Sequence, residues 1–148
     1  MKTILPLSID RTVSQMYRLA SQYWTDVLPM GWTTVPEVFG AIRMLPYTVD
    51  AQAPECGGAV ECVKRPGLTL VLGGDCDDKA VLSGAAMNAL NIPWHIVTSS
   101  GSPDLEMEHT YIEIVGELDG KLMWLPFDAT KPDLDLYTEH PYTAKITW

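Results

Sequence analysis

One stretch of the sequence, residues 72–82, constrains the fold of the chain more than any other. It begins at the end of an apolar run, passes through two glycines, and places Cys76 among three aspartates. Apolar residues then recur at the three- and four-residue spacing of a helix, and Asn91 is a suitable stop for that helix. Because Asp75 is a good N-cap, the sequence predicts a helix that begins at Cys76 and extends to about Leu90.

The position of Cys76 has two opposite consequences for its thiol. At the start of a helix, the unpaired backbone amides create a positive field that favours the reactive thiolate. The carboxylates of Asp75, Asp77 and Asp78 act the other way, because nearby negative charges raise the pKa of a thiol. A nucleophilic Cys76 therefore needs a base or an imidazolium close to it, and the histidines that follow the helix are the candidates.

The composition fits one acidic globular domain over residues 1–148. The chain is 47% hydrophobic and 20% charged, with a formal net charge of -9. Its length allows a sizeable core, and its negative charge argues against a protein that binds the phosphate backbone of nucleic acids. No run has the length of a membrane span, and the N-terminal stretch is too short and interrupted for a signal peptide. Three cysteines cannot all pair within one chain, so we expect a reducing, cytoplasmic location, with neither nucleic acid nor membrane as partner.

Two helices are expected before the cysteine. The first follows an amphipathic stripe in residues 13–27, with Ser8 or Asp10 as its cap. The second spans residues 36–45, is capped by Thr34 and begins with a proline, which is well tolerated in the first turn. An irregular segment rich in proline and glycine then leads to the apolar run.

The chain becomes strand-like after the central helix. Alternating apolar residues predict strands at residues 92–98, 109–115 and 122–128, and residues 117–120 form a hairpin signal between the last two. We therefore expect an α+β fold, in which the helix that begins at Cys76 packs against an antiparallel sheet.

The predicted hairpin brings a histidine close to an aspartate. A four-residue loop at 117–120 would place His109 directly opposite Asp128. A two-residue turn within that loop would instead pair Asp128 with Tyr111 and leave His109 as a diagonal neighbour. Both registers keep the imidazole and the carboxylate within side-chain reach, so the sequence predicts the pair and leaves the register open.

Four short motifs surround these positions: Gly74-Asp75-Cys76-Asp77-Asp78, Leu90-Asn91-Ile92-Pro93, His109-Thr110-Tyr111-Ile112-Glu113 and Trp124-Leu125-Pro126-Phe127-Asp128-Ala129-Thr130. In order, they resemble the nucleophile box, the segment after its helix, the histidine strand and the aspartate strand of the transglutaminase-like superfamily, which shares its Cys-His-Asp arrangement with papain-like peptidases. Upstream, four further residues have the spacing of short bacterial and phage-borne members: Tyr47, Asp50, Glu61 and Pro66. The resemblance covers roughly residues 45–132 and implies a papain-like core, with residues 8–45 as additional N-terminal helices.

The resemblance implies acyl transfer through a thioester on Cys76. His109 would accept the thiol proton, and Asp128 would orient the imidazole and stabilise its charge. The amide of Cys76, at the helix N-terminus, would face the oxyanion of the tetrahedral intermediate. No cofactor and no metal ion are implied for this chemistry.

The acyl acceptor distinguishes the functions that such a site allows. With water, the protein would be a peptidase or amidase that acts on a peptide or protein substrate, and a small single domain resembles these hydrolytic members most. With an amine, it would be a cross-linking transglutaminase. A third reading is a non-catalytic interaction module on the same fold, for example a phage assembly factor associated with the virion.

Other residues leave alternatives open around this site. His95 stands where many members of the superfamily carry arginine, and the second oxyanion donor has no recognisable motif, with Gln52 and Trp32 as candidates. Cys56 and Cys62 are separated by five residues, a longer spacing than that of a zinc knuckle. They are read as unpaired loop thiols or, with His95 or His140, as a zinc site.

Overall fold

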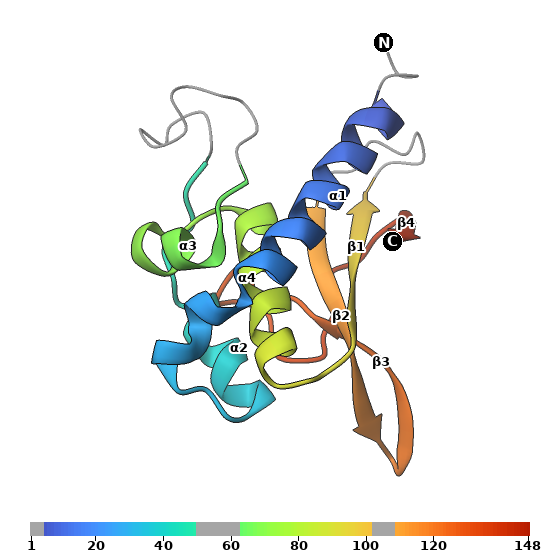
Figure 1. The fold of residues 1–148 in the computed structure, drawn as a ribbon. Coiled ribbons are helices and arrows are strands. Elements are labelled where there is room, and N and C mark those ends of the chain that lie inside the picture. The colour runs from blue at the N-terminus through green and yellow to red at the C-terminus, as the bar shows by residue number, and fades with distance from the viewer. Residues whose placement is uncertain (1–4, 50–62, 102–108) are drawn as a thin grey trace.

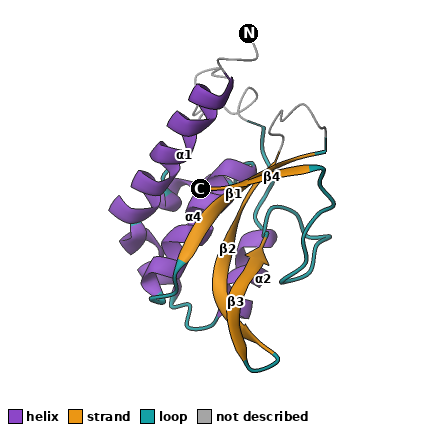
Figure 2. Cartoon of the chain, turned by 90° about the vertical axis from the view of Figure 1, so that its right-hand side faces the viewer, coloured by secondary structure: helices purple, strands orange, loops and turns teal. Residues whose placement is uncertain are grey.

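The computed structural model of the chain describes residues 5–49, 63–101 and 109–148. Within these ranges the helices lie on one side of a curled, four-stranded antiparallel sheet of order β3-β2-β1-β4 (Figure 1 and Figure 2). The predicted α+β class is confirmed. In chain order the elements are α1 (Leu5–Gln22), the 3-10 helix η1 (Trp24–Met30), α2 (Val35–Arg43), α3 (Pro66–Leu72), α4 (Cys76–Ala89), β1 (Trp94–Ser100), β2 (His109–Leu118), β3 (Lys121–Phe127) and β4 (Ala144–Thr147).

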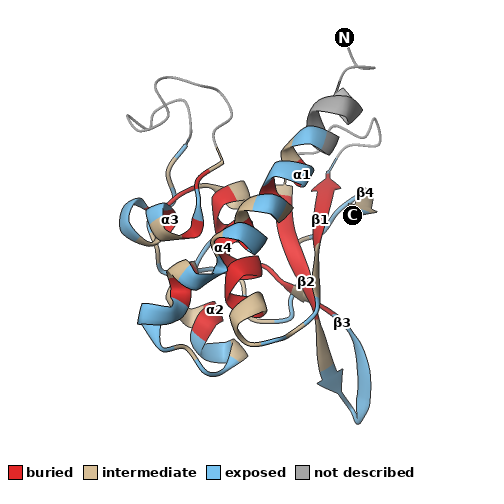
Figure 3. Ribbon diagram, viewed as in Figure 1, coloured by how far each residue is buried: buried red, intermediate tan, exposed pale blue. Residues whose placement is uncertain are grey.

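Helix α4 lies at the centre of the fold. It begins at Cys76, as predicted, because two carboxylates cap it reciprocally. Asp75 accepts the backbone N–H of Asp78 at 3.3 Å, and Asp78 accepts that of Asp75 at 3.2 Å. Every residue from Asp78 to Met87 is buried, and Figure 3 shows this buried helix between the other helices and the sheet. The predicted packing of the cysteine helix against an antiparallel sheet is confirmed.

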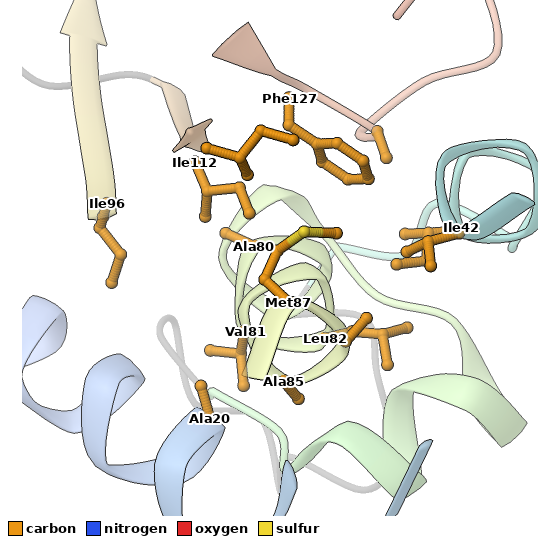
Figure 4. Close-up of a cluster of buried hydrophobic side chains, with 14 of the residues drawn as sticks. Ala20, Ile42, Ala80, Val81, Leu82, Ala85, Met87, Ile96, Ile112 and Phe127 are labelled. Carbon is orange, nitrogen blue, oxygen red and sulfur yellow. The ribbon is translucent and has the colours of Figure 1, made fainter. Parts of the chain in front are cut away.

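The hydrophobic core surrounds α4 on all sides. Figure 4 shows apolar side chains of α4 pointing in several directions, toward α1, α2 and the sheet. On the sheet side, the ring of Phe127 meets that of Phe39 edge-on, with centroids 5.3 Å apart. The fully buried residues of this cluster include Ala20, Ile42, Val81, Leu82, Ala85, Ile96 and Ile112. A helix buried on every face cannot show a one-sided apolar stripe, which is why α4 is not amphipathic.

Helix α4 also carries a buried lysine, Lys79, that is hydrogen-bonded to the segments after α2 and after β3. The Nζ of Lys79 donates to the backbone carbonyls of Leu45 and Thr130, both at 2.8 Å. Burial lowers the pKa of Lys79 to about 8, and the charge of Asp128 acts in the opposite direction. Lys79 thus fastens the segment after β3 to the first turn of α4.

The N-terminal helices agree with the sequence pattern in place and differ in extent. Helix α1 begins at Leu5, so the predicted cap at Ser8 or Asp10 is wrong, because both residues lie inside the helix. Helix α1 ends before the end of the predicted stripe, because the chain tightens into η1, which contains Pro29 and buries Val27. Helix α2 is capped as predicted, by the hydroxyl of Thr34, which accepts the N–H of Glu37 at 3.3 Å. None of the helices in the described ranges is long and apolar enough to cross a membrane.

The hairpin between β2 and β3 resolves the register that the sequence leaves open. The pairs Ile112↔Phe127 and Leu118↔Lys121 leave a two-residue turn at Asp119 and Gly120. Both turn residues have positive φ, 52° and 77°, which is the backbone of a type I′ turn. Continued by one residue, this register sets Tyr111 opposite Asp128, so His109 is the diagonal neighbour of that aspartate.

Two elements are not predicted by the sequence pattern. The apolar run before the glycines forms helix α3, which ends at Gly73, whose positive φ of 76° favours glycine. The last residues of the chain form β4, which pairs with the free edge of β1 through Val97↔Thr147 and its neighbours. Trp148 then donates its Nε1–H to Thr98 at 2.9 Å, and this contact anchors the C-terminal end of the described chain.

A substitution at Gly84 tests how tightly α4 packs against β1. A Cβ at this position would lie 2.5 Å from the ring of Trp94, which is stacked on Tyr17 and donates to Asn88 at 2.8 Å. We expect Gly84→Ala to lower the free energy of unfolding by about 1–3 kcal/mol through overpacking, despite the better helix propensity of alanine. Urea denaturation measures this change.

Gly40 provides the matched control, because a Cβ there meets nothing within 4 Å and the residue lies inside α2. Gly40→Ala should raise the free energy of unfolding by up to about 1 kcal/mol. Equal stabilisation by both substitutions would contradict the described contact between Gly84 and Trp94.

Candidate active site

The predicted pair of His109 and Asp128 forms in the structure. His109 begins β2, Asp128 follows β3 directly, and the Nε2 of the imidazole lies 2.6 Å from the Oδ2 of the carboxylate. Asp128 is 1% exposed, and its other oxygen, Oδ1, accepts the N–H and the hydroxyl of Thr130 at 3.2 and 2.6 Å. Burial alone would raise the pKa of Asp128, but hydrogen bonds and the charge of His109 outweigh it and hold the pKa below its usual value. The carboxylate is therefore ionised at neutral pH.

A second histidine, His140, joins this pair from the irregular segment between β3 and β4. Its Nδ1 lies 3.1 Å from the same Oδ2 of Asp128, and its ring stands edge-on to that of His109 with centroids 5.3 Å apart. The sequence indicates His140 only as a possible zinc ligand together with Cys56 and Cys62, and no local pattern around it predicts this position beside Asp128. One carboxylate oxygen thus serves two imidazoles.

Cys76 lies at the first position of α4, next to the strand that carries His109. A hydrogen bond with the backbone of Thr110, the residue after His109, lowers the pKa of the thiol, and the charge of Asp128 raises it. The larger effects are burial and then the charges of Asp77 and Asp75, and together they raise the pKa well above its usual value. The thiol is therefore protonated at neutral pH.

The three predicted site residues are gathered in one region, but only two of them are joined directly. The Sγ of Cys76 lies 3.9 Å from the Oδ1 of Asp77. Within the described ranges, no hydrogen bond joins this sulfur to a ring nitrogen of His109. Because Nε2 of His109 is engaged by Asp128, Nδ1 is the ring nitrogen left for a thiol. The ring itself is stacked on Tyr111, with centroids 5.5 Å apart.

The chain immediately before Cys76 is held by a second segment. Gly74 donates to the carbonyl of Pro46 at 3.0 Å, and its own carbonyl accepts the N–H of Thr48 at 3.1 Å. A Cβ on Gly73, which has φ 76°, would collide with the carbonyl of Pro46. This close approach explains the glycine at position 73, and it places Tyr47 beside the site. Gly74 has a different reason, because a Cβ there would lie 2.4 Å from the Cβ of Asp78.

A pocket of about 320 Å³ opens onto the two histidines. Its wall includes the end of β1, the start of β2 and parts of the segment between β3 and β4. The lining residues are Tyr47, Ser99, Ser100, Gly101, His109, Thr130, Lys131, His140 and Pro141. Lys131 directs its ammonium toward the ring of Tyr47, 5.4 Å from the centroid. The lining therefore includes hydroxyls, two imidazoles and one ammonium group.

The remaining candidates have other positions. His95 is paired with Glu113 at 2.6 Å and packed on Trp124, away from the pocket. Trp32 packs against the hydrophobic core. Five of the residues singled out in the sequence lie outside the described residues: Asp50, Gln52, Cys56, Glu61 and Cys62.

Comparison with protein-family models, curated proteins and solved structures gives no match to this chain. The site therefore has to be interpreted from its own geometry.

Proposed function

We propose that the protein catalyses thiol-dependent acyl transfer, with Cys76 as nucleophile, His109 as base and Asp128 as the residue that orients the base. The observation that carries this proposal is the 2.6 Å contact between His109 and a buried, ionised Asp128. A carboxylate held in this way fixes the imidazole tautomer and stabilises the imidazolium that forms when the ring accepts a proton. A papain-like core, as in the transglutaminase-like superfamily, is part of this proposal.

The proposed reaction begins with the thiol. Sγ of Cys76 exchanges its contact with Asp77 for one with His109, Nδ1 takes the thiol proton, and the sulfur attacks the carbonyl carbon of a peptide or amide. The backbone amide of Cys76, at the N-terminus of α4, donates to the developing oxyanion. The leaving amine takes the proton from His109, and a thioester remains on Cys76.

Water then completes the cycle. His109 takes a proton from the attacking water, the thioester breaks, and the proton returns to the sulfur as the acid product leaves. The polar pocket beside the two histidines supports a peptide or protein substrate. With an amine in place of water, the same steps would give a cross-linking transglutaminase.

A second candidate function is a non-catalytic interaction module. It is favoured by the raised pKa of Cys76 and by the contact of its sulfur with Asp77, since both keep the thiol protonated and unreactive. In this reading, His109, Asp128 and His140 would stabilise this end of the sheet, where β2 begins and β3 ends, and shape a binding pocket.

The pH dependence of alkylation separates the two functions. We expect iodoacetamide to modify Cys76 already near pH 6. The reason is that a thiol of raised pKa reacts at this pH only if a neighbouring base takes its proton. Peptide mapping by mass spectrometry follows Cys76 alone among the three cysteines.

Two histidine variants complete the experiment. His109→Ala should move the rise in rate into the alkaline range of a thiol with a raised pKa, whereas His95→Ala should leave the profile unchanged, because His95 lies away from the pocket. If wild type and His109→Ala both react only at alkaline pH, the interaction module is correct and the enzyme proposal fails.

A further inference from the structure

Two of the three histidines of the chain converge on one aspartate oxygen. The donor atoms Nε2 of His109, Oδ2 of Asp128 and Nδ1 of His140 all lie within 4.8 Å of one another. Two imidazoles and one carboxylate are a common ligand set for divalent transition-metal ions. We propose that these three side chains bind such an ion, with Zn²⁺ as the ion to test, and that the bound ion blocks the action of His109 on Cys76. The blocking rests on the proposed acyl-transfer function, whereas metal binding itself does not.

The contacts of Oδ2 of Asp128 with the two imidazoles are close to the separations that metal binding requires. Zn–N and Zn–O bonds of about 2.0–2.2 Å in a tetrahedral site separate the donor atoms by roughly 3.3 Å. The contact between Oδ2 of Asp128 and His140 is 3.1 Å, and the one with His109 is 2.6 Å. The ion would take the place of the protons that now lie between each imidazole and the carboxylate. Each neutral imidazole would then carry its proton on its other ring nitrogen, which in His109 is Nδ1.

Hydrogen bonds outside the cluster hold the carboxylate in the orientation that a metal site needs. Oδ1 of Asp128 accepts both the N–H and the hydroxyl of Thr130, which leaves Oδ2 directed at the imidazoles. Lys79 donates to the carbonyl of Thr130 at 2.8 Å and so fastens this turn to α4. Outer contacts of this kind orient ligands and contribute to metal affinity.

The segment that carries His140 is anchored separately. The carboxylate of Glu139 accepts the hydroxyl of Tyr111 and the Nζ of Lys145, the latter at 2.9 Å. Lys145 also contacts Glu113 of β2 at 3.0 Å. His140 is thus positioned by contacts to β2 and β4, although its own segment is irregular.

The cluster is accessible and lies in a favourable charge environment. His109 and His140 both line the pocket of about 320 Å³, so an ion can enter from it and keep a coordination position open toward it. Asp128 is ionised, the chain carries a formal net charge of -9, and Asp75 and Asp77 are close enough to raise the pKa of the neighbouring thiol. These negative charges attract a divalent cation and act against the ammonium of Lys131 in the pocket wall.

Direct binding of Zn²⁺ by isothermal titration calorimetry tests the site. The full chain carrying Cys56→Ser, Cys62→Ser and Cys76→Ala is used, so that no thiol can bind the ion. We expect one Zn²⁺ per chain, and we expect His140→Ala in this background to weaken the affinity roughly 100-fold or more, since even the loss of an outer partner costs 10- to 100-fold. His95→Ala is the matched control and should bind as tightly as the parent, because His95 is paired with Glu113 and packed on Trp124. Absence of binding, or equal affinity in the His140 variant, would overturn the proposal.

The effect on the thiol is tested separately in the protein with Cys76 intact. Saturating Zn²⁺ should slow alkylation of Cys76 in a Cys56→Ser/Cys62→Ser background, and this slowing should be lost when His140→Ala is added. Each variant is compared with itself at the same pH, with and without the ion. If Zn²⁺ binds but the alkylation rate of Cys76 is unchanged, the proposed blocking of His109 is wrong. The metal site itself would still be supported by the calorimetry.

Discussion

Cys76→Ala is expected to abolish covalent labelling of the protein by a peptidyl vinyl sulfone directed at the pocket. The proposed reaction forms its bond to carbon through Sγ of Cys76, at the start of α4 and beside the strand of His109. Alanine keeps the helix and its capping box, which depend on Asp75 and Asp78, so the protein should remain folded. Intact-mass spectrometry over time measures the labelling, and circular dichroism checks the fold.

Substitutions of His109 and Asp128 should slow the labelling by different factors. His109→Ala should slow labelling by about 100- to 10,000-fold, the usual contribution of a positioned base. Asp128→Asn should cost less, because it leaves the imidazole in place and changes only its tautomer and the stabilisation of its charge. Asparagine can still accept the hydrogen bonds of Thr130 through its carbonyl, so this variant changes the contacts of Oδ2 with His109 and His140 and leaves those of Oδ1 in place.

A cysteine pair elsewhere in the sequence is the control. Replacing Cys56 and Cys62 together by serine should leave the labelling rate nearly unchanged. Labelling that persists in Cys76→Ala and disappears in this double variant would assign the reactivity to those cysteines and reduce Cys76 to a part of the packed helix.

Asp78→Ala is expected to lower the free energy of unfolding by about 3–5 kcal/mol, the usual cost of removing one partner of a buried ion pair. Asp78 has no exposed surface, and its carboxylate lies 3.0 Å from Nζ of Lys64, which is itself 2% exposed. The same carboxylate accepts the backbone N–H groups of Lys64 and Asp75 at 2.8 and 3.2 Å. Its loss therefore removes the capping box of α4 and a contact to the ammonium of Lys64 in one step. Urea denaturation measures the change against a total stability of typically about 5–15 kcal/mol.

Asp135→Ala is the matched control, because Asp135 is 93% exposed and lies 3.9 Å from Arg43. It should change stability by less than about 1 kcal/mol. The double variant Lys64→Met/Asp78→Ala should cost less than the two single variants added together, because the two groups interact. A loss below about 1 kcal/mol in Asp78→Ala would contradict the described burial of this pair.

Local sequence signals were sufficient to predict much of the structure around the site. Asp75 placed the start of α4 correctly, because an N-cap depends on residues within one turn of it. The hairpin signal placed His109 and Asp128 within reach of each other, since two strands joined by a short turn must lie side by side. The choice between the two registers depended on whether Asp119 adopts positive φ, which it does, and which aspartate tolerates better than most residues.

The fold beyond these local units required tertiary information. Strand β4 is short and carries no strong alternation, and it forms because the edge of β1 offers unpaired backbone groups to it. Helix α3 reads equally well as a buried strand, because a short apolar run does not distinguish the two. The contact between Gly84 and Trp94 could not be predicted from the sequence either. Neither residue alone indicates that the indole ring lies where a side chain at position 84 would be.

By itself, the sequence determined the parts of this protein that depend on neighbours along the chain: the capped cysteine helix, the tight hairpin, the histidine–aspartate pair and the α+β class. The tertiary structure alone decided that His140 shares the carboxylate of Asp128, and that the thiol of Cys76 lies against the backbone of Thr110. The physical reason is that these contacts join segments whose approach depends on burying a common core. The free energy of that burial is a property of the whole chain, and no short pattern carries it.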